Sequence, residues 1–126
     1  MENDKVVYEI NKYICSQLWI DFEVVSFYNE NLIIHGGVDL LYGVDIEIIF
    51  NNVFAVQGKF CWTISTDSDK NVKYLIFDNY DDRTMLENLQ PEIDYHLFAF
   101  NIDNDYDDKD LFFYIFAKSV QFSIKK

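Results

Sequence analysis

Residues 44–50 read Val-Asp-Ile-Glu-Ile-Ile-Phe, and this stretch decides the fold class. In an extended chain successive side chains point to opposite faces. One face of this segment would carry Val44, Ile46, Ile48 and Phe50, while Asp45 and Glu47 would lie on the other face. The alternation predicts a half-buried β-strand with one face on a core and the other in solvent.

The segment before this strand has the same character. Residues 19–27 are rich in β-branched and aromatic side chains, with Ile20, Phe22, Val24 and Ser26 on one predicted face. Residues 28–31 carry turn-forming Asn, and residues 32–35 return to an apolar pattern. The sequence therefore predicts a β-hairpin over 19–35, broken off by Gly36-Gly37.

A different period governs the N-terminus. Between residues 2 and 18 the apolar side chains recur at spacings of three and four, at Val6, Ile10, Tyr13, Ile14 and Leu18. This spacing predicts one amphipathic helix.

Downstream of Phe50 the pattern is again that of strands. Asn51-Asn52 predicts the end of the strand, and residues 53–65 predict one long or two short strands with a bend or bulge at Gly58. Further strands are expected over 72–77, 93–102 and 111–124, with a short helical turn over 84–89 that Pro91 stops. We expect an α+β, mainly β fold. It would consist of one domain over 1–126, in which the N-terminal helix precedes a predominantly antiparallel sheet of six to seven strands, either curved or a sandwich.

Composition limits the class of function. The 126 residues include 22 acids and 10 Lys or Arg, a formal net charge of -12, and 50% are hydrophobic. This hydrophobic content predicts a folded domain, and the charge disfavours binding to nucleic acid or anionic lipid. The N-terminus lacks the pattern of a secretory signal, and no apolar run approaches the roughly 20 residues of a membrane-spanning helix. We expect a cytoplasmic protein in which Cys15 and Cys61 are reduced and mostly buried.

Acidic residues concentrate in the segment between the last two predicted strands. Asp103, Asp105 and Asp107 alternate as in the opening of a calcium loop, but Asp108 and Tyr114 stand where an EF-hand needs Gly and Glu. Two interpretations remain: a solvated hairpin tip, or a surface for a basic protein partner. The candidate contact residues are Asp103, Asp105, Tyr106, Asp107, Asp108 and Asp110.

A second candidate group is Tyr80, Asp81 and Asp82, ahead of the predicted helical turn. Asp81 or Asp82 could instead cap that turn, since negative charge is favourable at a helix N-terminus. If both acidic segments lay at one end of the sheet, they would form a single negative face.

Catalytic signatures are lacking. His35 and His96 belong to no Ser/His/Asp or Cys/His motif that would place a catalytic partner locally, which favours structural roles for both. Carboxylate pairs are too abundant to single out one, and Gly36-Gly37 does not continue into a phosphate-binding loop. We expect no enzyme activity, no cofactor and no metal.

Three segments resemble small bacterial domains of the polymorphic-toxin immunity class, in particular immunity protein 50. They are Ile20-Asp21-Phe22-Glu23-Val24-Val25-Ser26-Phe27, the run from Val44 to Val53, and Phe116-Ala117-Lys118-Ser119-Val120-Gln121-Phe122. Ile20 stands at the position of the histidine in the family's opening motif. The resemblance implies a cytoplasmic, non-catalytic inhibitor that binds a cognate toxin, such as a nuclease, and blocks its site.

Two alternatives from other classes stay open. A nucleic-acid mimic would share the acidity but would arrange its carboxylates in an extended stripe, whereas these acids cluster in loops. A small-ligand carrier or enzyme would need an apolar pocket, which a core rich in aromatic residues could enclose. The sequence also leaves homo-oligomerisation open.

Overall fold

The computed structural model describes residues 2–65, 74–78, 95–102 and 111–125. These residues form the helix α1 (Asn3–Cys15) and seven strands. The strands are β1 (Trp19–Tyr28), β2 (Asn31–Gly37), β3 (Ile46–Gln57), β4 (Cys61–Ser65), β5 (Leu75–Phe77), β6 (His96–Ile102) and β7 (Leu111–Ile124). The predicted helical turn over 84–89 lies outside the described residues.

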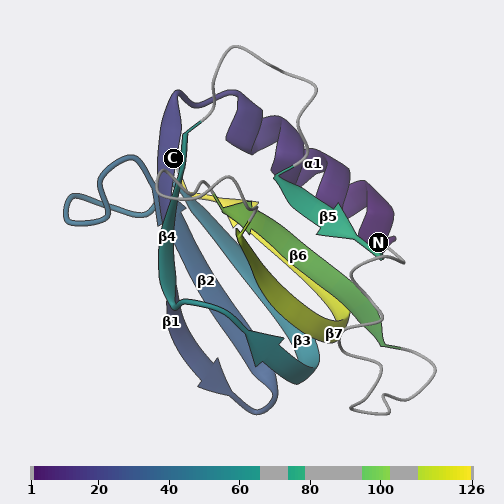
Figure 1. Ribbon diagram of the computed structural model, residues 1–126. Coiled ribbons are helices and arrows are strands. Elements are labelled where there is room, and N and C mark those ends of the chain that lie inside the picture. Colours follow the sequence, from purple (N-terminus) through teal and green to yellow (C-terminus); the bar gives the residue numbers. More distant parts are fainter. Residues whose placement is uncertain (1, 66–73, 79–94, 103–110, 126) are drawn as a thin grey trace.

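All seven strands belong to one antiparallel sheet with the order β4-β1-β2-β3-β7-β6-β5. The sheet curls into a half-barrel, and α1 lies along β5 at its open side (Figure 1). The α+β, mainly β prediction is confirmed, and the sheet is curved rather than split into a sandwich.

The concave side of the sheet holds the core. Alternate residues of the predicted strand, Ile46, Ile48 and Phe50, are fully buried there. Aromatic rings fill the interior: Trp62 of β4 stacks on Phe113 of β7 at a centroid distance of 4.9 Å. Aromatic pairs of this kind contribute beyond their buried area, so the rings hold the two arms of the curled sheet together.

Helix α1 packs its apolar stripe onto this core through Val6, Val7, Ile10 and Ile14. It ends at Cys15, three residues earlier than predicted. Leu18 therefore leaves the stripe and is 86% exposed, contrary to its predicted place in the helix.

Two asparagine amides attach α1 to the sheet. The Asn11 amide donates to the Leu75 carbonyl at 2.7 Å, and its oxygen accepts from the backbone N–H groups of Tyr74 and Leu75 at 2.8 and 2.7 Å. Asn3 donates to the Lys118 carbonyl and accepts from the Val120 N–H. Backbone groups that no neighbouring strand satisfies are thus paired by the helix.

Of two predicted breaks, one is displaced and one is wrong. Gly36 and Gly37 are the last two residues of β2, so the chain leaves the strand just after them, and a Cβ at Gly36 would stand 2.6 Å from the Phe22 ring. Asn51-Asn52 lies within β3, where Asn52 has a left-handed φ of 54°. That residue resets the alternation, so that Phe50 and Val53 both face the core.

The remaining boundaries shift by a few residues. The strand predicted over 72–77 is described from Leu75, and the one predicted over 93–102 from His96, with residues 72–73 and 93–94 outside the described residues. Ser26, predicted to share a face with Val24, pairs with Ile33 after a register shift. Cys15 is half-buried, but Cys61 is exposed, which corrects the prediction that both thiols are mostly buried. No helix in the described part of the chain has the length and apolar character needed to cross a membrane.

Candidate protein-binding surface

Acidic side chains line the outer, convex face of the sheet. Glu23 of β1 pairs with His35 of β2, and His35 pairs with Glu47 of β3. Directly paired residues of neighbouring strands share a face, so these three side chains form one row across the sheet. The row continues to Cys61 on β4 and to Ser123 on β7.

One end of this row is neutralised in part. The His35 ring nitrogen Nε2 lies 2.9 Å from Glu47 Oε2, and Lys125 Nζ lies 3.7 Å from Glu47 Oε1. Glu23 is exposed and has no ion pair among the described residues. Asp21, two residues away on the same strand face, accepts the Thr63 hydroxyl at 2.6 Å. The acidic character is therefore strongest over β1, beside the uncharged outer face of β4.

A longer charge pattern underlies this face. No Lys or Arg occurs from residue 13 to residue 58, the span that contains the whole of β1, β2 and β3. The same span holds Asp21, Glu23, Glu30, Asp39, Asp45 and Glu47. This signal is a long stretch without bases and not a dense acidic run, so the local charge clusters of the sequence do not indicate it.

Exposed apolar side chains gather at one end of the β1–β2 pair. Leu41 and Tyr42, in the loop from Val38 to Asp45, are 94% and 90% exposed. The pairing of Asp21 with Gly37 places the beginning of β1, with half-exposed Trp19, beside the start of that loop. Large apolar side chains held out in solvent mark interaction surfaces when they occur together.

The loop that presents Leu41 and Tyr42 has internal hydrogen bonds. Asp39 accepts the Leu41 N–H with its carboxylate and the Tyr42 N–H with its backbone carbonyl. The Asp45 carboxylate accepts the Val38 N–H across the base of the loop. Backbone bonding of this kind fixes the loop and lowers the ordering cost that a contact with a partner would incur.

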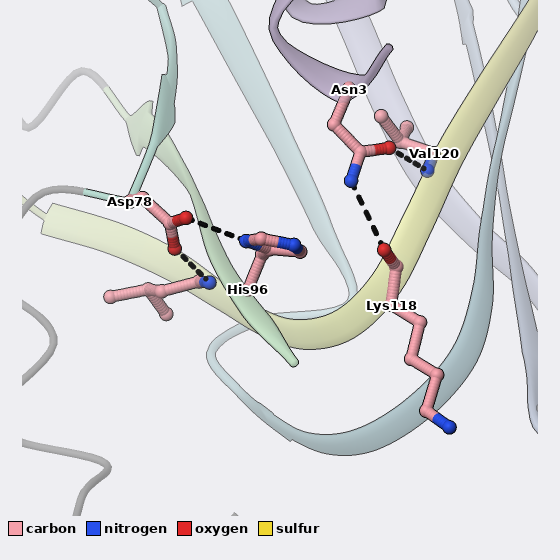
Figure 2. A network of polar contacts seen from close by, with 6 residues as sticks. Asn3, Asp78, His96, Lys118 and Val120 are labelled. Carbon is pink, nitrogen blue, oxygen red and sulfur yellow. Dashed lines mark hydrogen bonds and ion pairs between the residues drawn. The ribbon is translucent and has the colours of Figure 1, made fainter. Parts of the chain in front are cut away.

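His96 is held by a carboxylate at the other end of the sheet. Its Nδ1 lies 2.6 Å from Asp78 Oδ2, while Asp78 Oδ1 accepts the Leu97 N–H (Figure 2). The neighbouring contacts in Figure 2 join Asn3 of α1 to the backbone of Lys118 and Val120. The contacts of Asp78 connect the end of β5 to β6, and those of Asn3 connect α1 to β7.

Both histidines have carboxylate partners that sequence reasoning did not find. Glu47 comes from the next strand in the sheet, and Asp78 lies 18 residues before His96. Within the described residues, no group of three or more His, Cys, Asp or Glu is arranged to hold a metal ion.

The predicted contact residues themselves are not among those described. Asp103, Asp105, Tyr106, Asp107, Asp108 and Asp110, together with Tyr80, Asp81 and Asp82, fall in the segments 79–94 and 103–110.

The residues that flank these two segments are placed, and they lie apart. Asp78 and Tyr95 lie at one end of β6, whereas Ile102 pairs with Leu111 at its other end. At about 3.3 Å per residue, β6 separates the two pairs of flanking residues by roughly 20 Å. The single acidic face made from both segments stays a prediction, because the segments themselves lie outside the described residues.

Comparisons with protein-family models, with curated proteins and with solved structures find no match for this chain.

Proposed function

We propose that the protein is a non-catalytic acidic binding protein that occludes the functional site of a basic protein partner, as an immunity-type inhibitor does with its cognate toxin. The observation that carries the proposal is the span from residue 13 to residue 58, which contains three adjacent strands and their connections and holds six carboxylates but neither Lys nor Arg.

Charge and apolar exposure would have separate roles in this function. Uncompensated carboxylates on one face attract a basic partner and raise the association rate, an effect that salt weakens. Exposed anchors such as Tyr42 and Trp19 supply apolar contact area once the partner has arrived. A nuclease fits this description, because its phosphate-binding site is basic and carboxylates can occupy it.

The product of the adjacent gene is the partner to test, by isothermal titration with the purified full chain. We expect binding that weakens at least tenfold between about 50 and 300 mM salt. Tyr42→Ala is expected to weaken binding about tenfold, or about 1.4 kcal/mol, without loss of fold, because the side chain is 90% exposed.

Tyr8→Ala is the matched control, since Tyr8 is 64% exposed on α1, away from the β2–β3 loop that carries Tyr42. Salt-independent binding, or an equal effect of the two substitutions, would argue against this surface. Absence of binding would argue against the function.

The predicted contacts in the 103–110 segment can be tested in the same titration. Replacing Asp105 and Asp107 by Lys removes two acids and adds two bases. We expect at least tenfold weaker binding at low salt if this segment contacts the partner. Unchanged affinity would remove the segment from the proposed surface and leave the outer face of β1–β3 as the contact.

A small-ligand carrier is the second candidate, and one observation favours it. The indole Nε1 of Trp62 is buried and has no hydrogen-bond partner within the described part of the chain. An unsatisfied buried donor costs about 1–3 kcal/mol, and a ligand with an acceptor atom would satisfy it. A thermal-shift screen against small metabolites tests this function, because only a specific ligand would raise the melting temperature of the wild type and not of Trp62→Phe.

A further inference from the structure

The two edge strands of the sheet differ in how their outward backbone groups are used. β5 and β4 stand at opposite ends of the strand order. On β5, the N–H and carbonyl of Leu75 that face away from β6 are both bonded to Asn11. Among the described residues, no side chain bonds in this way to the outward backbone groups of β4.

The pattern of hydrogen bonds between β4 and β1 shows which backbone N–H groups of β4 point away from the sheet. Val24 donates to the Phe60 carbonyl, so the pair Val24–Phe60 is a hydrogen-bonded one. In an antiparallel ladder such pairs alternate, so Trp62 and Ile64 direct their N–H groups to β1. Cys61 and Thr63 therefore direct theirs away from the sheet, and both residues are exposed.

The faces beside this edge have opposite chemistry. On the outer face, Cys61 and Thr63 lie next to Glu23 and Asp21, and the Asp21 carboxylate already reaches Thr63. On the concave side, Phe60 lies two residues before Trp62, on the same face of the strand, and is 67% exposed. A strand placed beside β4 would meet carboxylates on one face and an uncovered aromatic ring on the other.

We propose that β4 binds an extended segment of the basic partner by strand addition, with Lys or Arg alternating with apolar residues in that segment. Backbone bonds to Cys61 and Thr63 provide the attachment, and the alternating side chains provide the specificity. This inference rests on the proposed function, since it supplies the docking mode for the same basic partner.

Charge decides between a partner strand and a second copy of this chain. A second copy paired through its own β4 would bring together two molecules that each carry a net charge of -12, with Asp21 and Glu23 of each molecule one strand inside the shared edge. Like charges brought together at an interface are unfavourable, whereas Lys or Arg on an added strand would be attracted.

The test uses the full chain, labelled with nitrogen-15, and an acetylated nine-residue peptide of alternating Lys and Val. Amide hydrogen exchange at Cys61 and Thr63 is expected to slow at least tenfold on saturation, with little change on β3. The same peptide with Glu in place of Lys, or with alternate backbone nitrogens methylated, is expected not to bind.

Thr63→Pro removes an outward N–H that the fold does not use, and proline is tolerated at such edge positions. It should abolish peptide binding. Thr63→Val loses the hydroxyl but keeps the N–H, and should bind within about threefold of wild type. The methylated peptide tests the same bond without any substitution, in case Thr63→Pro does not fold.

Three results would overturn strand addition: equal peptide binding by Thr63→Pro, equal binding of the methylated peptide, or dimerisation of the chain through β4. If the product of the adjacent gene binds wild type and Thr63→Pro equally, strand addition fails and the proposed function stands. If that product binds neither protein, the proposed function fails as well.

Discussion

Asn11 should contribute more to stability than any other polar side chain of α1. Its amide makes three hydrogen bonds, all to the backbone of Tyr74 and Leu75, which are 5% and 0% exposed. Asn11→Ala leaves two N–H groups and one carbonyl without these partners. A net hydrogen bond is worth about 0.5–1.5 kcal/mol, so three give about 2–4 kcal/mol. The better helix propensity of Ala offsets roughly 0.5 kcal/mol. We therefore expect a loss of about 2–3 kcal/mol.

Urea denaturation followed by circular dichroism measures this loss as a lower midpoint at unchanged slope. Hydrogen exchange at the Leu75 amide should accelerate in the same variant. Lys12→Ala is the control, because Lys12 is the exposed neighbour of Asn11, and its loss should change stability by less than about 0.5 kcal/mol. If Asn11→Ala changed stability no more than Lys12→Ala, the attachment of α1 to β5 through this amide would be refuted.

Three further outcomes can be checked by the same denaturation assay. Asn3→Ala removes two bonds to β7 and should cost about 1–2 kcal/mol; a neutral result would show that water replaces them. Gly36→Ala would place a methyl group 2.6 Å from the buried Phe22 ring and should cost about 1–3 kcal/mol, so an unchanged midpoint would contradict the packing described. Burial, and then the Asp45 carboxylate, raise the pKa of Tyr13 above 10.0. The folded state thus favours the neutral phenol, and this stabilisation is present below pH 10 and lost as the pH rises through the folded pKa. Between pH 9 and 12 the wild type should lose stability more steeply than Tyr13→Phe, and parallel curves would count against this assignment.

The sequence alone could predict the elements whose pattern is local. The strand over 44–50 and the last strand, predicted and observed over 111–124, follow from alternation and from β-branched and aromatic content. The N-terminal helix follows from apolar spacing. The apolar spacing does not predict the C-terminal end of this helix. Leu18 continues the apolar stripe, yet the helix ends at Cys15 and Leu18 is 86% exposed.

The errors arose where a residue has a role set by distant parts of the chain. The pattern at Gly36 predicts a break in the strand, yet Gly36 lies in β2, where the Phe22 ring of the adjacent strand occupies the space that a side chain would need. Asn11 is one polar position of an amphipathic helix, and nothing in its neighbours indicates that it pairs with β5. The partners of both histidines likewise depend on strand pairing, which local patterns do not specify.

The candidate surface likewise combines features that a local pattern indicates with features that depend on strand pairing. Local groups of acidic residues stand out in a sequence, so the pattern indicates the segments around residues 80–82 and 103–110. The outer-face row of Glu23, His35 and Glu47 arises only when three strands pair in one register. The exposure of Leu41 and Tyr42 could not be foreseen either, because apolar residues in a short segment ordinarily predict burial.

The attachment of Asn11 to β5 also limits how many molecules can associate through sheet edges. A filament of sheets requires two usable edges on every molecule, one for each neighbour. With the outward groups of Leu75 occupied, the three-residue β5 offers only Phe77 for pairing in the described part of the chain. Edge-to-edge growth would therefore stop after a single step. Through its sheet the protein can take one added strand, and it should form complexes of one-to-one stoichiometry rather than fibres.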